Sequence, residues 1–140
     1  MSEARILGVE HLGVAVPDAE AAGTAFRTAF GLDMGHRESL PAHGVKTEFY
    51  PLGAGSEIEF IEPLDAENSI GKYLDRKGAG IHHLALRVQG IETLLEAMKA
   101  RGVRLIDELP RAGAQGKKVA FIHPKSMGGI LVELVEQPDQ

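Results

Sequence analysis

The sequence predicts an α+β fold in which two paired βαβββ modules form a curved mixed sheet, and two observations support this prediction. The chain repeats itself: residues 10–16 match residues 82–88, and residues 44–49 match residues 116–121. In each repeat, a segment of period-two alternation precedes apolar residues at helical spacing, as in a strand followed by an amphipathic helix. We therefore expect one domain over residues 1–140, with module 1 at about 6–62, a linker helix at about 63–80 and module 2 at about 81–137.

The first module begins with a strand in which the branched residues of the segment Leu12–Val16 share one face, while His11 lies on the other. A helix follows, with Asp18 as its N-cap and Gly31 as its stop. Period-two patterns then predict three more strands, at residues 32–38, 45–52 and 57–62.

The second module repeats this order of elements. Its first strand places His83 on the face opposite the branched residues, and its helix carries an apolar stripe from Ile91 to Met98 and ends before Gly102. Strands are predicted at residues 103–108, 117–122 and 130–136. Between the modules, Asn68 and Ser69 predict the start of a short linker helix.

Length and composition are those of a globular domain. The 140 residues are 44% hydrophobic, which is enough for a core, yet no apolar run reaches the roughly 18 residues that a membrane span needs. The first residues lack the basic and then apolar layout of a secretory signal, so we expect a cytoplasmic protein without a membrane partner. The absence of cysteine excludes disulfides and thiolate metal sites, so any bound metal would need nitrogen and oxygen ligands.

The charge balance argues against a nucleic-acid partner. Fifteen Lys and Arg against 20 Asp and Glu give a formal net charge of −5, whereas nucleic-acid-binding surfaces are basic. Two Tyr and five Phe also provide few rings on which bases could stack. A small anionic ligand remains compatible with this composition where basic residues cluster locally.

Strand phase places one histidine and one glutamate of each module on the face away from the predicted helices. These four residues are His11, Glu59, His83 and Glu133. Each residue alone is more often a hydrogen-bonded or solvated side chain than a ligand. Their matching positions in a repeat favour a metal site, because two imidazoles and two carboxylates suit a divalent cation of intermediate hardness. The histidines without such a partner pattern are His36, His43 and His123.

Three motifs carry a family resemblance: VEHLGVAVPD at residues 9–18, GIHHLA at residues 80–85, and a long run from Arg104 to Glu133 that contains HPKS followed by two glycines. These motifs resemble the vicinal oxygen chelate (glyoxalase, bleomycin resistance, dioxygenase) superfamily. Within it, the third motif resembles the methylmalonyl-CoA epimerases. The resemblance spans nearly the whole chain and implies a sheet of paired modules arranged around a metal site.

The resemblance implies an isomerase that interconverts (2R)- and (2S)-methylmalonyl-CoA by proton transfer at C2, through an enolate that a metal stabilises. It implies His11, Glu59, His83 and Glu133 as the ligands of one divalent ion per chain, with cobalt, manganese, nickel, zinc and magnesium not distinguished. Glu133 is the expected first proton carrier. A homodimer, a role in propionate metabolism and acceptance of ethylmalonyl-CoA or a related acyl thioester also follow from the resemblance.

Glu48 is the expected second proton carrier, with two interpretations open. Part of the family has a carboxylate base three residues after the glycine that corresponds to Gly44, a position held here by Thr47. Because one residue turns a strand side chain to the other face, Glu48 is either a base reached through a shifted register or an exposed glutamate.

A polyanionic acyl-CoA substrate needs local positive charge. Arg111, Lys117, Lys118 and Lys125 gather near two glycine-containing loops and are the expected CoA contacts, with a solvated charged surface as the alternative.

Two other functions remain open at this point. One is a glyoxalase I-type lactoylglutathione lyase, which uses similar two-histidine, two-carboxylate chemistry. The other is a metal-free module of the same fold that binds a small ligand, and metal analysis would separate it from an enzyme.

Overall fold

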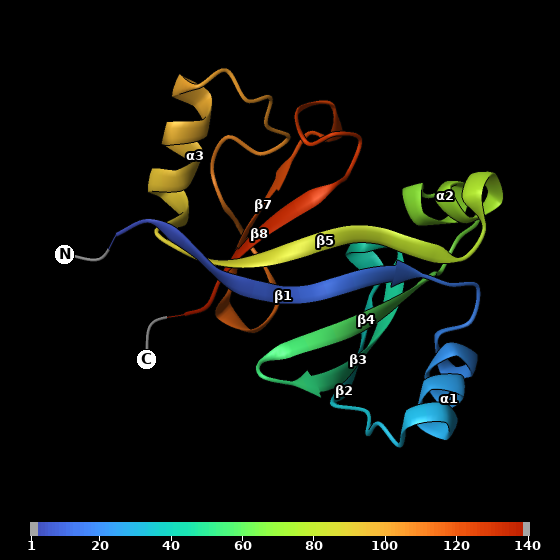
Figure 1. Ribbon diagram of the computed structural model, residues 1–140. Coiled ribbons are helices and arrows are strands. Elements are labelled where there is room, and N and C mark those ends of the chain that lie inside the picture. The colour runs from blue at the N-terminus through green and yellow to red at the C-terminus, as the bar shows by residue number, and fades with distance from the viewer. Residues whose placement is uncertain (1–2, 139–140) are drawn as a thin grey trace. The chain divides into compact units, whose positions relative to one another are not determined.

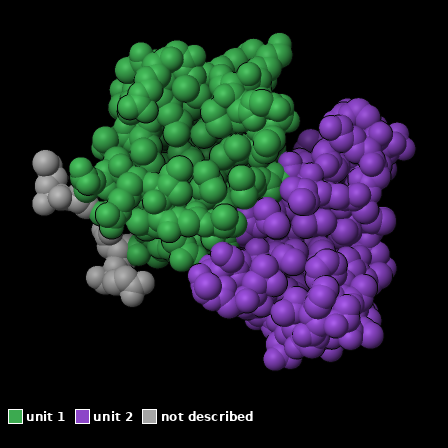
Figure 2. Space-filling view, viewed as in Figure 1, with its two compact units in different colours: residues 1–10, 83–140 green, residues 11–82 purple. Residues whose placement is uncertain are grey.

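The computed structural model describes residues 3–138, and the chain divides into two compact units (Figure 2). Unit 1 comprises residues 1–10 and 83–140, and unit 2 comprises residues 11–82. Strand β1 (Arg5–Ala15) contributes residues to both units, and so does strand β5 (Gly80–Gln89). Within the described residues, no helix is long and apolar enough to cross a membrane.

Unit 2 contains strands in the order β2-β3-β4-β1 (Figure 1). Its elements after β1 are α1 (Ala19–Phe30), β2 (His36–Leu40), β3 (Val45–Gly53), β4 (Ser56–Pro63) and α2 (Ser69–Lys77). Strand β1 pairs in parallel with β4, whereas the β2–β3 and β3–β4 pairs are antiparallel. This arrangement is the mixed sheet that the βαβββ pattern predicts.

The two faces of this sheet pack against different helices. One face, which we call the α1 face, carries a buried cluster with α1: Val16, Ala19, Tyr50 and Phe60. The other face, which we call the α2 face, carries a buried cluster with α2: Ala15, Val45, Ile61 and Ile70. Because strand side chains alternate between faces, every strand residue of unit 2 can be assigned to one of the two.

Unit 1 contains strands in the order β5-β8-β7-β6. Its other elements are α3 (Ile91–Ala100), β6 (Arg111–Ala112), β7 (Lys118–Ile122) and β8 (Val132–Glu136). A buried cluster joins α3 to the sheet: Val88, Ile91, Leu95, Ala120, Ile122, Val132 and Leu134. We call this side the α3 face. The predicted order of elements is therefore present in both halves of the chain.

The helix ends follow the sequence signals, with one addition. The Asp18 carboxylate accepts a hydrogen bond from the Ala21 amide at 3.0 Å, and Gly31 ends α1 in the left-handed conformation. The Asn68 side chain caps α2 by accepting from the Gly71 amide at 2.8 Å. These caps confirm the predicted helix starts at Asp18 and Asn68.

The addition is a cap supplied by the last strand of each half. Glu62 on β4 accepts a hydrogen bond from the Ala19 amide at 2.9 Å. Glu136 on β8 accepts from the Gly90 and Ile91 amides, each at 3.0 Å. A carboxylate at a helix N-terminus satisfies free amides and interacts favourably with the helix dipole. The repeat thus extends to a pair of long-range contacts that sequence spacing did not indicate.

The strand predicted at residues 103–108 is wrong. Only an isolated bridge between Leu105 and Ile122 forms there, and the strand beside β7 is Arg111–Ala112. The Asp107 carboxylate accepts a hydrogen bond from the Phe121 backbone amide at 2.8 Å. In a regular β-sheet this amide would bond to a backbone carbonyl of the neighbouring strand. This competition between side chain and backbone explains the irregular segment.

The boundaries of several other strands also differ from prediction: the strand expected at 130–136, for example, begins at Val132. The strand expected at 32–38 runs instead from His36 to Leu40, and ahead of it the Gly35 amide donates a hydrogen bond to the Phe49 carbonyl of β3. The first strand begins at Arg5, five residues before the repeated segment 10–16 from which it was predicted.

Candidate metal centre

The first candidate pair lies on the α2 face of unit 2. His11 on β1 and Glu59 on β4 are 3.3 Å apart, from Nε2 to Oε1, and their side chains are 11% and 14% exposed. The β1–β4 register aligns Glu59 with Gly13, two residues after the histidine. Two residues along a strand return a side chain to the same face, so the pair meets without any bulge.

The second pair lies in unit 1 on the side opposite the α3 face. His83 on β5 and Glu133 on β8 are 3.2 Å apart, from Nε2 to Oε1, and their side chains are 6% and 10% exposed. The β5–β8 register aligns Glu133 with Ala85, again two residues after the histidine. The sequence repeat has therefore preserved the contact between the two side chains as well as the residue types.

An aromatic ring supports each histidine. Phe49 is the cross-strand neighbour of Glu59 and meets the His11 ring edge to face, with centroids 6.4 Å apart. Phe121 is the cross-strand neighbour of Glu133 and meets the His83 ring in the same way at 5.8 Å. Edge-to-face contacts restrict the orientation of an imidazole. The two phenylalanines were aligned in the sequence repeat, but only the strand register shows what they do.

The chemistry of these side chains fits a divalent cation. His11, His83 and Glu133 are buried, and each offers one ligand atom to a metal. Buried carboxylates need a cationic partner or hydrogen-bond donors, and a mixture of imidazole and carboxylate ligands suits a transition-metal ion or Mg²⁺.

Glu48 occupies the α1 face, away from the His11 and Glu59 pair. It is 2% exposed and is the cross-strand neighbour of Phe60, in a register that is continuous from Val45 to Pro51. The expectation of an exposed glutamate is therefore wrong, and the sheet shows no register shift at this residue. Its role as second proton carrier stays a prediction that this position does not support.

The contacts of Glu48 are those of a buried structural carboxylate. The Tyr50 hydroxyl donates a hydrogen bond to its Oε1 at 2.9 Å, and Arg37 Nη2 lies 3.2 Å from its Oε2. Burial raises the pKa of the Tyr50 hydroxyl, and the hydrogen bond to the Glu48 carboxylate and its negative charge add to this effect.

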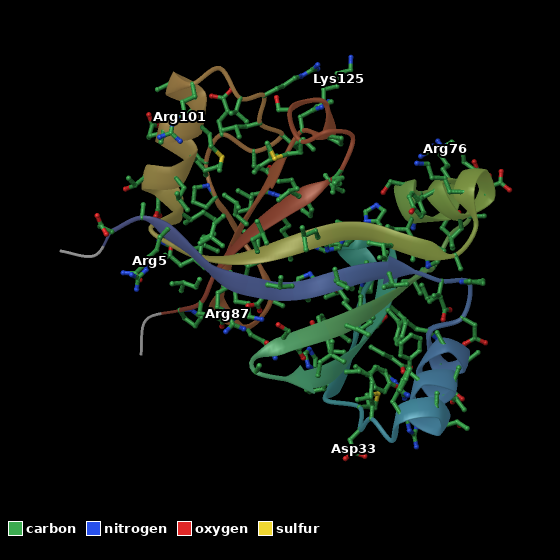
Figure 3. The ribbon with its side chains drawn as sticks, viewed as in Figure 1. Arg5, Asp33, Arg76, Arg87, Arg101 and Lys125 are labelled. Carbon is green, nitrogen blue, oxygen red and sulfur yellow. The ribbon has the colours of Figure 1, made fainter. Side chains whose placement is uncertain are left out.

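A second buried carboxylate organises unit 1. Glu10 is 2% exposed and accepts hydrogen bonds from the side chains of Arg87 at 2.7 Å, Lys117 at 3.0 Å and Gln137, through its Nε2 atom, at 2.9 Å (Arg87 is labelled in Figure 3). Burial opposes ionisation of Glu10, but the hydrogen bonds from Arg87 and Lys117, with their charges, outweigh it and lower the pKa of this carboxyl group. Glu10 therefore joins β1 to the strands of unit 1.

The four basic residues expected to contact CoA have different surroundings. Lys117 is engaged by Glu10, and Lys118 forms an ion pair with Glu92 on α3 at 2.7 Å. Arg111 lies over the Phe121 ring and pairs with Asp107 at 3.0 Å. Lys125 extends outward from the loop after β7 (Figure 3). Of these four residues, Arg111 is the best placed for a role near the candidate metal ligands, because Phe121, which it contacts, is the cross-strand neighbour of Glu133.

Comparisons with known proteins agree with this architecture. Residues 10–121 match the family model of the Glyoxalase/Bleomycin resistance protein/Dioxygenase superfamily. The chain is 38% identical over 128 residues to the ethylmalonyl-CoA/methylmalonyl-CoA epimerase of Cereibacter sphaeroides. The aligned region covers 90% of this chain and 95% of that protein.

Solved structures give the same result. The methylmalonyl-CoA epimerase of Mycobacterium tuberculosis superposes with a TM-score of 0.90 at 33% identity, covering 99% of this chain and 93% of that chain. A Streptomyces coelicolor methylmalonyl-CoA epimerase variant in complex with 2-nitronate-propionyl-CoA superposes with a TM-score of 0.87 at 28% identity, covering 96% of this chain and all of that chain. The predicted α+β fold is confirmed, and the chain belongs to the Glyoxalase/Bleomycin resistance protein/Dioxygenase superfamily, in its methylmalonyl-CoA epimerase family.

Proposed function

We propose that this protein is a metal-dependent methylmalonyl-CoA epimerase. The single observation that carries the proposal is the duplicated pair of a buried histidine and a glutamate, His11 with Glu59 and His83 with Glu133. The relatives from Bos taurus and Cereibacter sphaeroides, which are 36% and 38% identical to the chain, are epimerases of methylmalonyl-CoA. A related solved structure holds a nitronate analogue of an acyl-CoA, which supports a CoA thioester as the substrate.

In this proposal the two pairs ligate one divalent cation per chain. When bound, the cation supplies a Lewis acid that stabilises the negative charge developing on the substrate oxygens. The burial of His11, His83 and Glu133 keeps water away from the charged groups and strengthens their electrostatic effect. The identity of the metal follows from geometry and availability more than from the donor set.

The reaction needs a proton to leave C2 on one face of the substrate and to return on the other. Glu133 is the proposed carrier on one face, because it is a buried carboxylate with a histidine partner and thus held in one position. Arg111, Lys117, Lys118 and Lys125 remain the proposed CoA contacts. A homodimer, a cytoplasmic location and a place in propionate metabolism are part of the same proposal.

A glyoxalase I-type lyase is not favoured, because the Cereibacter sphaeroides relative is an ethylmalonyl-CoA/methylmalonyl-CoA epimerase and the related substrate-analogue complex is that of a methylmalonyl-CoA epimerase. A metal-free binding module would leave the duplicated histidine and glutamate pairs without a function.

The proposal is tested by hydrogen exchange at C2 of methylmalonyl-CoA. Protein loaded with a divalent metal is incubated with the substrate in D₂O, and the methyl signal is followed by proton NMR. We expect the methyl doublet to collapse as deuterium enters C2, and we expect chelation of the metal to stop the exchange reversibly. A folded, metal-loaded sample that produces no exchange above the enzyme-free rate would reject the proposal.

A further inference from the structure

An epimerase of this kind needs a second proton carrier, and the α2 face of unit 2 is where such a group should lie. His11 and Glu59 are on this face, whereas Glu48 is on the other. On β2, Leu40 packs against the α2 cluster and therefore lies on the α2 face. Because side chains alternate along a strand, Glu38 and His36 lie on the same face, and Ser39 and Arg37 lie on the other.

His36 and Glu38 form a hydrogen-bonded pair. The His36 Nε2 atom lies 3.1 Å from Glu38 Oε1, and the two side chains are about one-third exposed, at 31% and 27%. The His36 ring stacks on Phe49, with centroids 4.3 Å apart and planes 12° from parallel. Since Phe49 also forms a T-shaped contact with the His11 ring, one phenylalanine links the His36 pair to the candidate metal ligand.

The hydroxyl of Thr47 is an independent observation in favour of a ligand-binding position beside Glu38. Thr47 is the direct cross-strand neighbour of Glu38, so both side chains lie on the α2 face. Thr47 as a whole residue is 1% exposed, and among the described residues its hydroxyl has no hydrogen-bond partner. A buried polar group without a partner is costly, and a bound substrate oxygen or its associated water would remove that cost.

The other acidic residues of this sheet are less suited to the task. Glu59 lies 3.3 Å from His11, and Glu62 caps helix α1. Glu48 is on the opposite face, where it contacts Tyr50 and Arg37. Glu57 also lies on the α2 face, where it is the cross-strand neighbour of His11. It is farther along β4 from Thr47 than Glu59 is. Glu38 is the carboxylate that stands next to the unpartnered hydroxyl.

We propose that Glu38 is the second proton carrier and that His36 positions it, an inference that rests on the proposed function. In one direction the C2–H bond breaks, its electron pair enters the enolate of the thioester, and the Glu38 carboxylate takes the proton. Glu133, which is protonated at the start of this direction, then delivers its proton to the opposite face of C2. The reverse reaction exchanges the two roles, and after each turnover the two carboxyl groups regain their starting protonation states by proton exchange with water.

The test separates proton exchange from inversion of configuration. Each epimer of methylmalonyl-CoA is incubated separately in D₂O with metal-loaded Glu38→Gln protein. Deuterium at C2 is measured by NMR, and configuration with an enzyme that consumes one epimer. We expect inversion to fall by about 10²-fold or more, the usual contribution of a proton-transfer group. Exchange without inversion should persist for the epimer whose C2 proton faces Glu133.

His36→Phe tests the positioning role, because phenylalanine retains the stack on Phe49 but cannot bond to Glu38. We expect this variant to lower the ratio of inversion to exchange in the same direction as Glu38→Gln. A residue that only supports the fold would lower both rates together and leave the ratio unchanged.

Glu57→Gln is the matched control, since it removes a carboxylate from the same face of the same sheet. It should keep the wild-type ratio of inversion to exchange. The inference is overturned if Glu38→Gln leaves inversion intact, if it slows both rates equally, or if Glu57→Gln or Glu48→Gln produces the split instead. If wild-type protein shows neither inversion nor exchange, the proposed function itself has failed, and this outcome is distinct from the others.

Discussion

Replacing Glu133 with glutamine is expected to lower the rate of epimerisation by at least about 10³-fold, near the upper part of the range for loss of a proton-transfer group. Glutamine has nearly the same shape and retains an oxygen that can reach a metal, but it cannot accept a proton at C2. The rate is measured on metal-loaded protein with the metal content of each sample determined, so that loss of the ion is distinguished from loss of proton transfer.

Glu108→Gln is a suitable control for this variant, because Glu108 is an exposed residue of the irregular segment before β6. It should retain wild-type activity. Near-normal epimerisation by a folded, metal-loaded Glu133→Gln protein would refute the assignment of Glu133 as a proton carrier.

Replacing Glu10 with glutamine is expected to reduce the free energy of unfolding by about 3 kcal/mol, as when one partner of a buried ion pair is removed. The change leaves Arg87 and Lys117 directed at a side chain that no longer balances their charges. Because a domain of this size is stable by only about 5–15 kcal/mol, the loss should be clear in urea unfolding at neutral pH.

The matched variant is Glu92→Gln, which breaks the exposed ion pair between Glu92 and Lys118 in the same unit. Such surface pairs contribute roughly 0–1 kcal/mol, so its unfolding midpoint should stay close to that of the wild type. Equal stabilities of the two variants would show that the Glu10 network does not hold unit 1 together.

The sequence was sufficient for the fold class and for the two histidine and glutamate pairs, and the reason is physical. Period-two alternation determines the face of a strand residue once one face is known to be apolar. His11 and His83 could therefore be assigned to the face away from the helices before any pairing was known. The duplication then indicated which glutamates to place beside them.

The features that sequence reasoning missed depend on long-range register or on side chains that replace backbone partners. The stack of His36 on Phe49 requires the β2–β3 pairing, because nothing in the spacing of residues 36 and 49 indicates that they are neighbours. The Asp107 carboxylate disrupts a strand that its residue pattern favoured. Glu48 was ambiguous from sequence because a shift of one residue changes its face, and only the observed register decides this.

The most direct test of the central claim, that both pairs hold one cation, is anomalous diffraction from crystals of the protein grown with Zn²⁺. We predict a single anomalous peak per chain within about 2.0–2.2 Å of ligand atoms of His11, Glu59, His83 and Glu133. Two separate peaks, each bound to one pair, or a zinc ion located elsewhere while all four side chains remain unligated, would contradict it.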